Sequence, residues 1–186
     1  MSLKTTLNYA PNFDFKKRKK RQIKFLIFHY TGMKRENEAI QKLTKIQSVV
    51  SVNYFVKKNG KIITMVPELY TAWHAGISKW GIYKFLNKNS IGIEISNPGH
   101  QFGYVNFSKQ QIKSLIKLSK FLINKYKIKK NCLLGHSDIA PDRKLDPGEK
   151  FPWMLLSQNK IGIWHNLGKK KLNFLRHKEV LVRENN

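Results

Sequence analysis

The segment GHSDIAPDRKLDPG, residues 135–148, brings acidic, basic and imidazole side chains together around two prolines. It contains one histidine, three aspartates, one arginine and one lysine, in a chain with only 11 acidic residues. A solvated surface loop would explain such charges. Imidazole and carboxylate groups are also the ligands of catalytic zinc sites, which keep one coordination position for water. The segment is therefore a candidate for metal-dependent hydrolysis if the fold supplies further ligands.

Two histidines stand at the ends of predicted buried strands. His29 closes the apolar run in residues 22–31, and His136 closes the run in residues 131–136. In open α/β sheets ligands bind at the carboxyl ends of strands, so both imidazoles are expected at that edge. Asp146 lies ten residues beyond His136. Each residue alone has an ordinary explanation, as a packed histidine or a turn residue before Pro-Gly. Together they predict a zinc site with one vacant position.

Hydrolysis also needs a proton carrier and a group that stabilises the oxyanion. Glu94 lies in a strand-like run, residues 90–96, on the face opposite to its isoleucines; an edge-strand glutamate facing water is an equally good interpretation. Lys144 precedes Asp146 by two positions, so both side chains project to one side of an extended chain. His74, in the motif AWHAG, is a rival metal ligand, although its loop setting favours the wall of a cleft.

The remaining pattern predicts an α/β domain with a central mixed sheet flanked by helices. Residues 52–66 are typical of a β-hairpin that turns at Asn-Gly. Residues 108–127 predict the clearest helix, with Ser108 and Gln111 as a capping box and an apolar stripe along one face. A weaker helical pattern covers residues 37–47, and one or two short helices are expected after about residue 153.

The net charge of +25 raises the hypothesis of a nucleic-acid partner. Only six of the 36 basic residues are arginine, the residue that favours bidentate phosphate contacts. The dense clusters, at residues 16–24 and 169–171, lie near the termini. We interpret them as solvated segments first and as polyanion-binding patches second. Nucleic acid is therefore not the expected partner, and an anionic cell-surface polymer would suit the same charge.

The sequence contains no apolar run near the roughly 18 residues of a membrane helix. Its N-terminal residues lack the apolar core of a secretory signal. Cys132 is the single cysteine, so no intrachain disulfide can form. A cytoplasmic location is the default expectation from these features.

Five segments resemble, in order and spacing, the zinc-dependent type-2 N-acetylmuramoyl-L-alanine amidases, whose fold is shared with peptidoglycan recognition proteins. These segments are FLIFHYT, VSVNYFVKKNGKIITMVPE, TAWHAGISKWG, NSIGIEISNPG and GHSDIAPDRKLDPGEKFPW. The resemblance covers residues 22–165, and the last segment is highly specific. It implies a zinc amidase domain at residues 22–165. The basic arm at residues 1–21 and the basic tail at 166–186 depart from the family pattern.

The family's residues fall on positions that are all present here. The resemblance implies zinc ligands at His29, His136 and Asp146, a catalytic glutamate at Glu94 and a catalytic lysine at Lys144. It implies hydrolysis of the amide between the lactyl group of N-acetylmuramic acid and L-alanine, in peptidoglycan or in muropeptides. It also makes a periplasmic or cell-envelope location the alternative to the cytoplasm.

Several points stay open at the level of sequence. His74, Trp73, Trp80 and Asn53 are candidates for contacts with the substrate, although the tryptophans serve equally well as core residues. Asn53 departs from the family pattern, which often has histidine there. The substrate is either intact wall polymer or a soluble fragment, with or without a 1,6-anhydro ring, and no obligate protein partner is implied. The main rival function is a binding module that keeps the fold without the chemistry.

Overall fold

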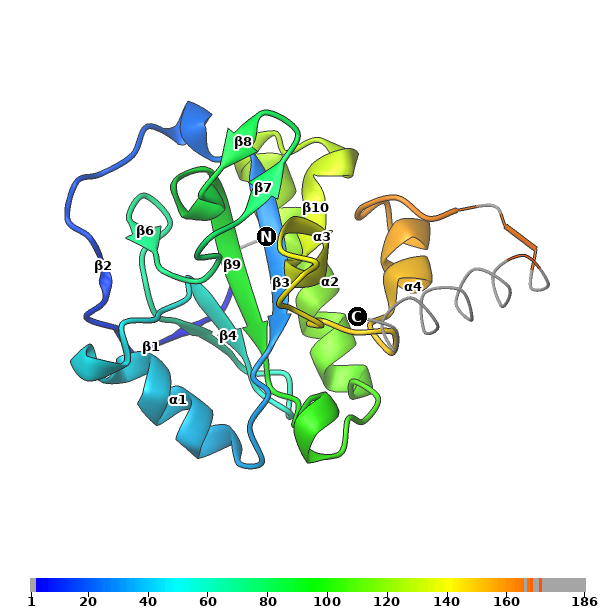
Figure 1. Ribbon diagram of the computed structural model, residues 1–186, viewed down its shortest axis with the longest axis horizontal. Coiled ribbons are helices and arrows are strands. Elements are labelled where there is room, and N and C mark those ends of the chain that lie inside the picture. The colour runs from blue at the N-terminus through cyan, green and yellow to red at the C-terminus, as the bar shows by residue number, and fades with distance from the viewer. Residues whose placement is uncertain (1–2, 166, 169–170, 172–186) are drawn as a thin grey trace.

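The computed structural model describes residues 3–165, 167–168 and 171. Its centre is a six-stranded sheet in the order β1-β5-β4-β9-β3-β10 (Figure 1). The strands are β1 (Thr6–Leu7), β5 (Ile62–Thr64), β4 (Tyr54–Val56), β9 (Ser90–Ile95), β3 (Phe25–Tyr30) and β10 (Leu133–Gly135). Neighbouring strands run parallel except the hairpin pair β4 and β5. The predicted mixed sheet is therefore confirmed.

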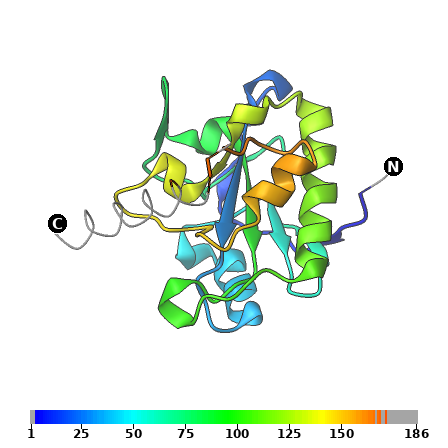
Figure 2. The ribbon, with the colours of Figure 1, turned by 90° about the vertical axis from the view of Figure 1, so that its right-hand side faces the viewer.

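Helix α2 (Lys109–Tyr126) covers one face of this sheet, as Figure 2 shows. Ile91, Ile93 and Ile95 of β9 point to that face and pack with leucines of α2. The opposite face is covered in two parts. Helix α1 (Glu36–Thr44) packs over Phe55 and its neighbours, and helix α3 (His136–Ile139) packs over Phe25 and Ile27. Because side chains alternate along a strand, His29 and Glu94 point to this second face.

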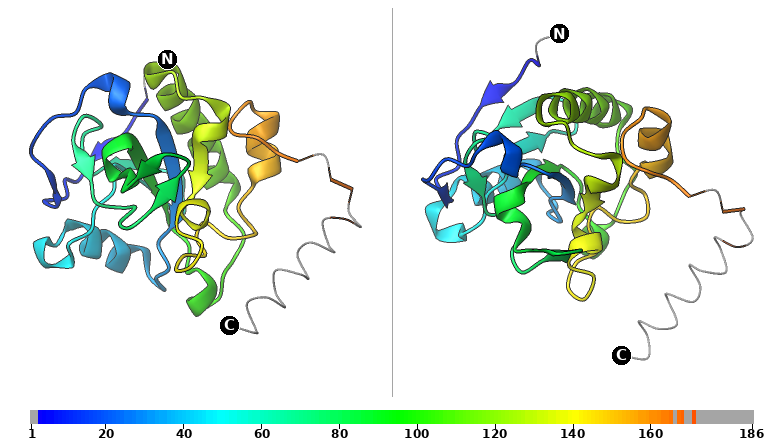
Figure 3. Two further views of the ribbon diagram at one scale, coloured as in Figure 1. Left: turned by 45° about the horizontal axis from the view of Figure 1, so that its top comes forward. Right: turned by 90° about the horizontal axis from the view of Figure 1, so that it is seen from above.

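The elements with strong local signals agree with prediction. Ser108 accepts a hydrogen bond from the backbone N–H of Gln111, and the Gln111 side chain accepts one from the backbone N–H of Ser108. This capping box starts α2 at the predicted position. The predicted hairpin forms with Gly60 at a positive φ of 79° in its turn. A short helix α4 (Trp153–Gln158) lies outside β10, at the sheet edge opposite β1 (Figure 3).

Part of the predicted basic arm, residues 1–21, packs on the rest of the domain. Strand β1 pairs with β5, and β2 (Phe13–Asp14) pairs with β6 (Thr71–Ala72). Arg18 is buried and donates hydrogen bonds to the backbone oxygens of Glu68, Asn87 and Ser90. Burial of this guanidinium among carbonyl groups holds the segment against the domain. Nearly all of the predicted basic tail, residues 166–186, lies outside the described residues.

Two further details were not predicted. The segment TAWHAGISKWG continues into a small hairpin of β7 (Lys79–Trp80) and β8 (Tyr83–Lys84). His136 begins α3 rather than ending a strand. In the residues that the structure describes, five 3-10 helices connect the main elements: Lys20–Gln22, Ile46–Ser48, Leu86–Asn89, His100–Phe102 and Lys130–Cys132.

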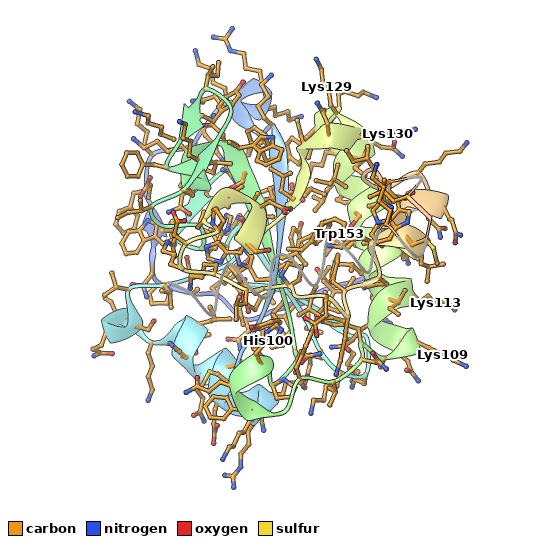
Figure 4. All side chains as sticks on the ribbon, turned by 45° about the vertical axis from the view of Figure 1, so that its right-hand side comes forward. His100, Lys109, Lys113, Lys129, Lys130 and Trp153 are labelled. Atoms are coloured by element: carbon orange, nitrogen blue, oxygen red, sulfur yellow. The ribbon has the colours of Figure 1, made fainter. Side chains whose placement is uncertain are left out.

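The surface lysines behave as solvated charge. Figure 4 shows Lys109, Lys113, Lys129 and Lys130 directed away from the ribbon, and all four are exposed. Within the described part of the chain, none of the helices combines the length and apolar character needed to cross a membrane.

Candidate metal centre

Three side chains from separate elements converge on one point. His29 comes from β3, His136 from the start of α3, and Asp146 from the loop that follows. The two Nδ1 atoms lie 3.0 Å apart, and the Asp146 Oδ2 atom lies 3.0 Å from His29 Nδ1 and 3.1 Å from His136 Nδ1. All three residues are buried. The structure therefore brings together the three residues that the sequence predicted as ligands.

The donor set fits a zinc ion. Burial and the neighbouring His136 lower the pKa of His29 to about 4, so this imidazole is neutral at neutral pH. Ligands of tetrahedral zinc at about 2.0–2.2 Å from the ion lie about 3.3–3.6 Å apart. The three distances between the candidate ligand atoms, 3.0–3.1 Å, are only slightly shorter. When the imidazole protons lie on the outer Nε2 atoms, the two Nδ1 lone pairs and the carboxylate oxygen repel one another, and a divalent cation removes that repulsion.

The outer nitrogen, Nε2, of each candidate ligand histidine also has a hydrogen-bond partner. His136 Nε2 lies 3.2 Å from the backbone oxygen of Ala75, and His29 Nε2 lies 3.0 Å from His74 Nδ1. Such contacts hold a ligand imidazole in one orientation and raise its basicity. The motif AWHAG thus lies behind both histidines. His74 approaches the site from the outer side of His29, away from the point where the three candidate ligand atoms meet.

A cavity of about 410 Å³ opens onto this centre. Glu94 and Lys144 both line it. Glu94 is the sheet neighbour of His29 and shares its face. Its enclosed position, together with the negative charge of Asp146, raises the pKa of Glu94 to about 8. A carboxyl group and an ammonium group therefore stand beside the candidate ligands, as the sequence predicted.

The other predicted substrate contacts lie in three different places. Trp73 lines the cavity, and its indole N–H donates to Asp14 Oδ1 at 2.8 Å. Trp80 lies on β7 and lines a different groove. Asn53 is fully buried; its amide donates to the Val66 oxygen at 3.2 Å and accepts from the Gly92 N–H at 3.1 Å. The prediction of Asn53 as a substrate contact is therefore wrong, because its amide links backbone segments within the fold.

Several residues of the site had no visible signal in the sequence. Asn87 Oδ1 accepts from the backbone N–H groups of His74 and Ala75, at 3.1 and 2.7 Å. Arg143 lines the cavity and donates to the Ala75 oxygen at 2.7 Å. Asparagine and arginine are common in loops, so only their three-dimensional contacts reveal that they fix the AWHAG segment.

The fold and this cluster together define a type-2 amidase. Residues 19–149 match the family model described as N-acetylmuramoyl-L-alanine amidase. The chain belongs to this family.

Among characterised relatives, the chain is 43% identical over 155 residues to the N-acetylmuramoyl-L-alanine amidase AmiD of Escherichia coli strain K12, covering 77% of this chain and 55% of that protein. It is 37% identical over 108 residues to the 1,6-anhydro-N-acetylmuramyl-L-alanine amidase AmpD of Haemophilus influenzae, covering 58% of this chain and 56% of that protein. The chain thus spans about half the length of these relatives.

Solved structures show the same fold. Escherichia coli AmiD in complex with the substrate anhydro-N-acetylmuramic acid-L-Ala-D-γ-Glu-L-Lys has a TM-score of 0.72 and 39% identity, covering 82% of this chain and 62% of that one. AmpDh3 of Pseudomonas aeruginosa in complex with an anhydromuramic pentapeptide has a TM-score of 0.73 and 33% identity, covering 78% of this chain and 62% of that one.

Proposed function

We propose that this protein is a zinc-dependent N-acetylmuramoyl-L-alanine amidase that hydrolyses the amide between the lactyl group of N-acetylmuramic acid and L-alanine. The observation that carries the proposal is the convergence of His29, His136 and Asp146 at the floor of a cavity that Glu94 and Lys144 also line. Residues 22–165, with the N-terminal strands packed on them, are the proposed catalytic domain.

The residues divide the chemistry between them. Bound zinc would supply a Lewis acid that polarises the scissile carbonyl and makes water a stronger nucleophile at neutral pH. Glu94 accepts the proton of the attacking water and returns it to the nitrogen of the leaving L-alanine. Lys144 places a positive charge beside the carbonyl oxygen as that oxygen becomes negative. The pKa of about 8 in the metal-free protein suits return of the proton to the leaving nitrogen. With a zinc ion bound beside Glu94, the added positive charge would lower this pKa and leave the carboxylate free to accept the proton of water.

The proposed substrate is a muropeptide with a 1,6-anhydro sugar. Support comes from the two related structures, which contain anhydromuramic peptides. The lining of the cavity agrees in charge, because it includes Lys42, Arg143 and Lys144, which would attract the carboxylates of a stem peptide. The cytoplasmic location expected from the sequence stays a prediction.

The test is to incubate the zinc-loaded protein with anhydro and non-anhydro muropeptides and to identify the products by mass. We expect release of the free stem peptide and of the sugar with an intact lactyl group. Glu94→Gln is the matched control, since it should keep zinc and lose about 10²–10⁴-fold in rate. Binding of both muropeptides without cleavage would assign the chain to the recognition modules instead.

A further inference from the structure

His74 connects a candidate ligand to the adjacent strand through a chain of hydrogen bonds. His74 Nδ1 lies 3.0 Å from His29 Nε2, and His74 Nε2 lies 3.1 Å from the hydroxyl oxygen of Ser90. The Ser90 hydroxyl in turn donates to the backbone oxygen of Leu86 at 2.7 Å. The chain of contacts thus runs from a fixed carbonyl group to the edge of the metal centre.

The direction of each proton in this chain follows from the Leu86 carbonyl. A carbonyl oxygen only accepts, so the single proton of the Ser90 hydroxyl points to Leu86. The Ser90 oxygen must then accept from His74, which places the proton of a neutral His74 on Nε2. His74 Nδ1 is left as an acceptor, and His29 must donate to it from Nε2. The Nδ1 of a neutral His29 therefore keeps a free lone pair.

The fold contains a slot that fits the His74 ring. A Cβ atom at Gly92 of β9 would come within 2.5 Å of the ring carbon Cγ of His74, so only glycine leaves room for the imidazole. The backbone of His74 is held by Asn87 Oδ1. Two positions thus accommodate the ring, Gly92 through its missing side chain and Ser90 through its hydroxyl, and Asn87 fixes the backbone of the same residue.

We propose that His74 is a positioning residue that, with Ser90, locks His29 in the Nε2–H tautomer and so presents its Nδ1 lone pair to the metal. The next residue, Ala75, does the same for His136 through its backbone oxygen. His74 is therefore not the rival ligand that the sequence allowed. The inference rests on the proposed zinc site, but the tautomers themselves exist without metal and without substrate.

The first test reads the tautomers directly in the metal-free protein. Long-range ¹H–¹⁵N NMR of the full chain with labelled histidine distinguishes Nδ1–H from Nε2–H imidazole. We expect His29 and His74 both to carry the proton on Nε2. An Nδ1–H tautomer of His29 in the unmodified protein would overturn the proposal.

The second test compares two substitutions of the same ring by competition for zinc with a chromogenic chelator. His74→Phe fills the slot but cannot accept a hydrogen bond, and we expect zinc affinity to fall about 10–100-fold. His74→Asn keeps an acceptor oxygen close to the place of Nδ1, and we expect affinity within a few-fold of the unmodified protein. Equal affinity for all three proteins would overturn the proposal, because the ring would then only fill space.

A third variant isolates the contribution of Ser90. Ser90→Ala releases the His74 tautomer and should weaken zinc binding a few-fold, but the same change should have no effect in the His74→Asn background. An equal loss of zinc affinity in both backgrounds would contradict an effect of Ser90 that acts through the His74 ring. If His74→Phe does not fold, the NMR result and this pair still decide. If zinc affinity depends on His74 and Ser90 as expected but muropeptides are not cleaved, the proposed function is refuted and the positioning role of His74 stands.

Discussion

A half-buried polar cluster around Glu68 and the buried cluster of candidate ligands differ in how their charges are satisfied. On the α2 face of the sheet, Glu68 receives a hydrogen bond from Tyr54 on one oxygen, at 2.5 Å, and from Tyr126 and Lys125 on the other. At the candidate metal centre, the Nδ1 atoms of His29 and His136 and an oxygen of Asp146 face one another. In the tautomers proposed above, all three atoms are acceptors. The Glu68 carboxylate receives hydrogen bonds from donors within its own cluster. At the candidate metal centre, the imidazole N–H groups point away from the cluster, toward His74 and Ala75.

The difference shows how a structural charge can be told from a functional one. A buried charge that meets enough donors is neutralised within the fold and needs nothing from outside. A group of buried acceptors without donors between them is costly unless a cation joins it. The outward N–H groups of both imidazoles, directed to His74 and Ala75, keep the inner lone pairs free for such a cation.

The largest predicted effect comes from giving the second cluster a donor of its own. In Asp146→Asn the new amide can donate to the imidazole Nδ1 atoms, so the site becomes internally satisfied. Zinc fingers gain about 10–16 kcal/mol from about four ligands, so loss of one ligand should weaken zinc binding about 10²-fold or more. The metal-free protein should become more stable by about 1 kcal/mol. Chelator competition and urea unfolding measure the two effects; unchanged zinc affinity would contradict the assigned ligand.

The second prediction tests whether the positive charge of Lys144 serves the reaction rather than the binding of zinc. Lys144→Ala should retain zinc and lose about 10²–10³-fold in turnover, because the developing oxyanion loses one stabilising cation. Muropeptide cleavage followed by mass and zinc content measured on the same sample provide the test. Loss of zinc in this variant would show that Lys144 supports the ligands rather than the reaction.

Prediction from the sequence succeeded where a residue type and a local pattern agreed. His29 and Asp146 were found because ligand-type side chains follow a buried strand or lie in a constrained loop, and α2 because Ser108 and Gln111 form a capping box. These signals are contained within a few consecutive residues. They predicted most of the sheet and the three residues that meet at the candidate metal centre.

Prediction failed where a contact joins distant segments. Arg18 was assigned to a solvated arm, yet its guanidinium is fixed by carbonyl groups some 50 to 72 residues away. Asn53 looked like a cleft residue, but its amide bridges β4 to β9. The position of His74 depends on the absence of a side chain at Gly92, which no local pattern reveals.

The third effect tests the self-sufficient cluster. Burial raises the pKa of Glu68, but hydrogen bonds from Lys125, Tyr126 and Tyr54 outweigh it and leave the pKa below its usual value. The ionised carboxylate therefore stabilises the fold above the usual carboxyl pKa, and this contribution is lost as the pH falls through the lowered pKa. Glu68→Gln should cost about 1–3 kcal/mol at pH 7, and less in acid, with zinc affinity unchanged. A loss of zinc affinity in this variant would show that the clusters are not independent.

The smallest effect is a pH dependence of folding stability at Glu94, opposite in sign to the one expected at Glu68. Its folded pKa of about 8 in the metal-free protein lies above that of the unfolded chain. Between the usual carboxyl pKa and pH 8 the folded protein therefore holds a proton that the unfolded chain has lost, so stability falls as the pH rises through this window. Glu94→Gln removes this slope. Because solvent reaches part of the side chain, we expect a difference of about 1 kcal/mol between pH 5 and pH 8.5. Urea unfolding of both metal-free proteins measures it, and parallel pH profiles would show that Glu94 is already ionised in the fold.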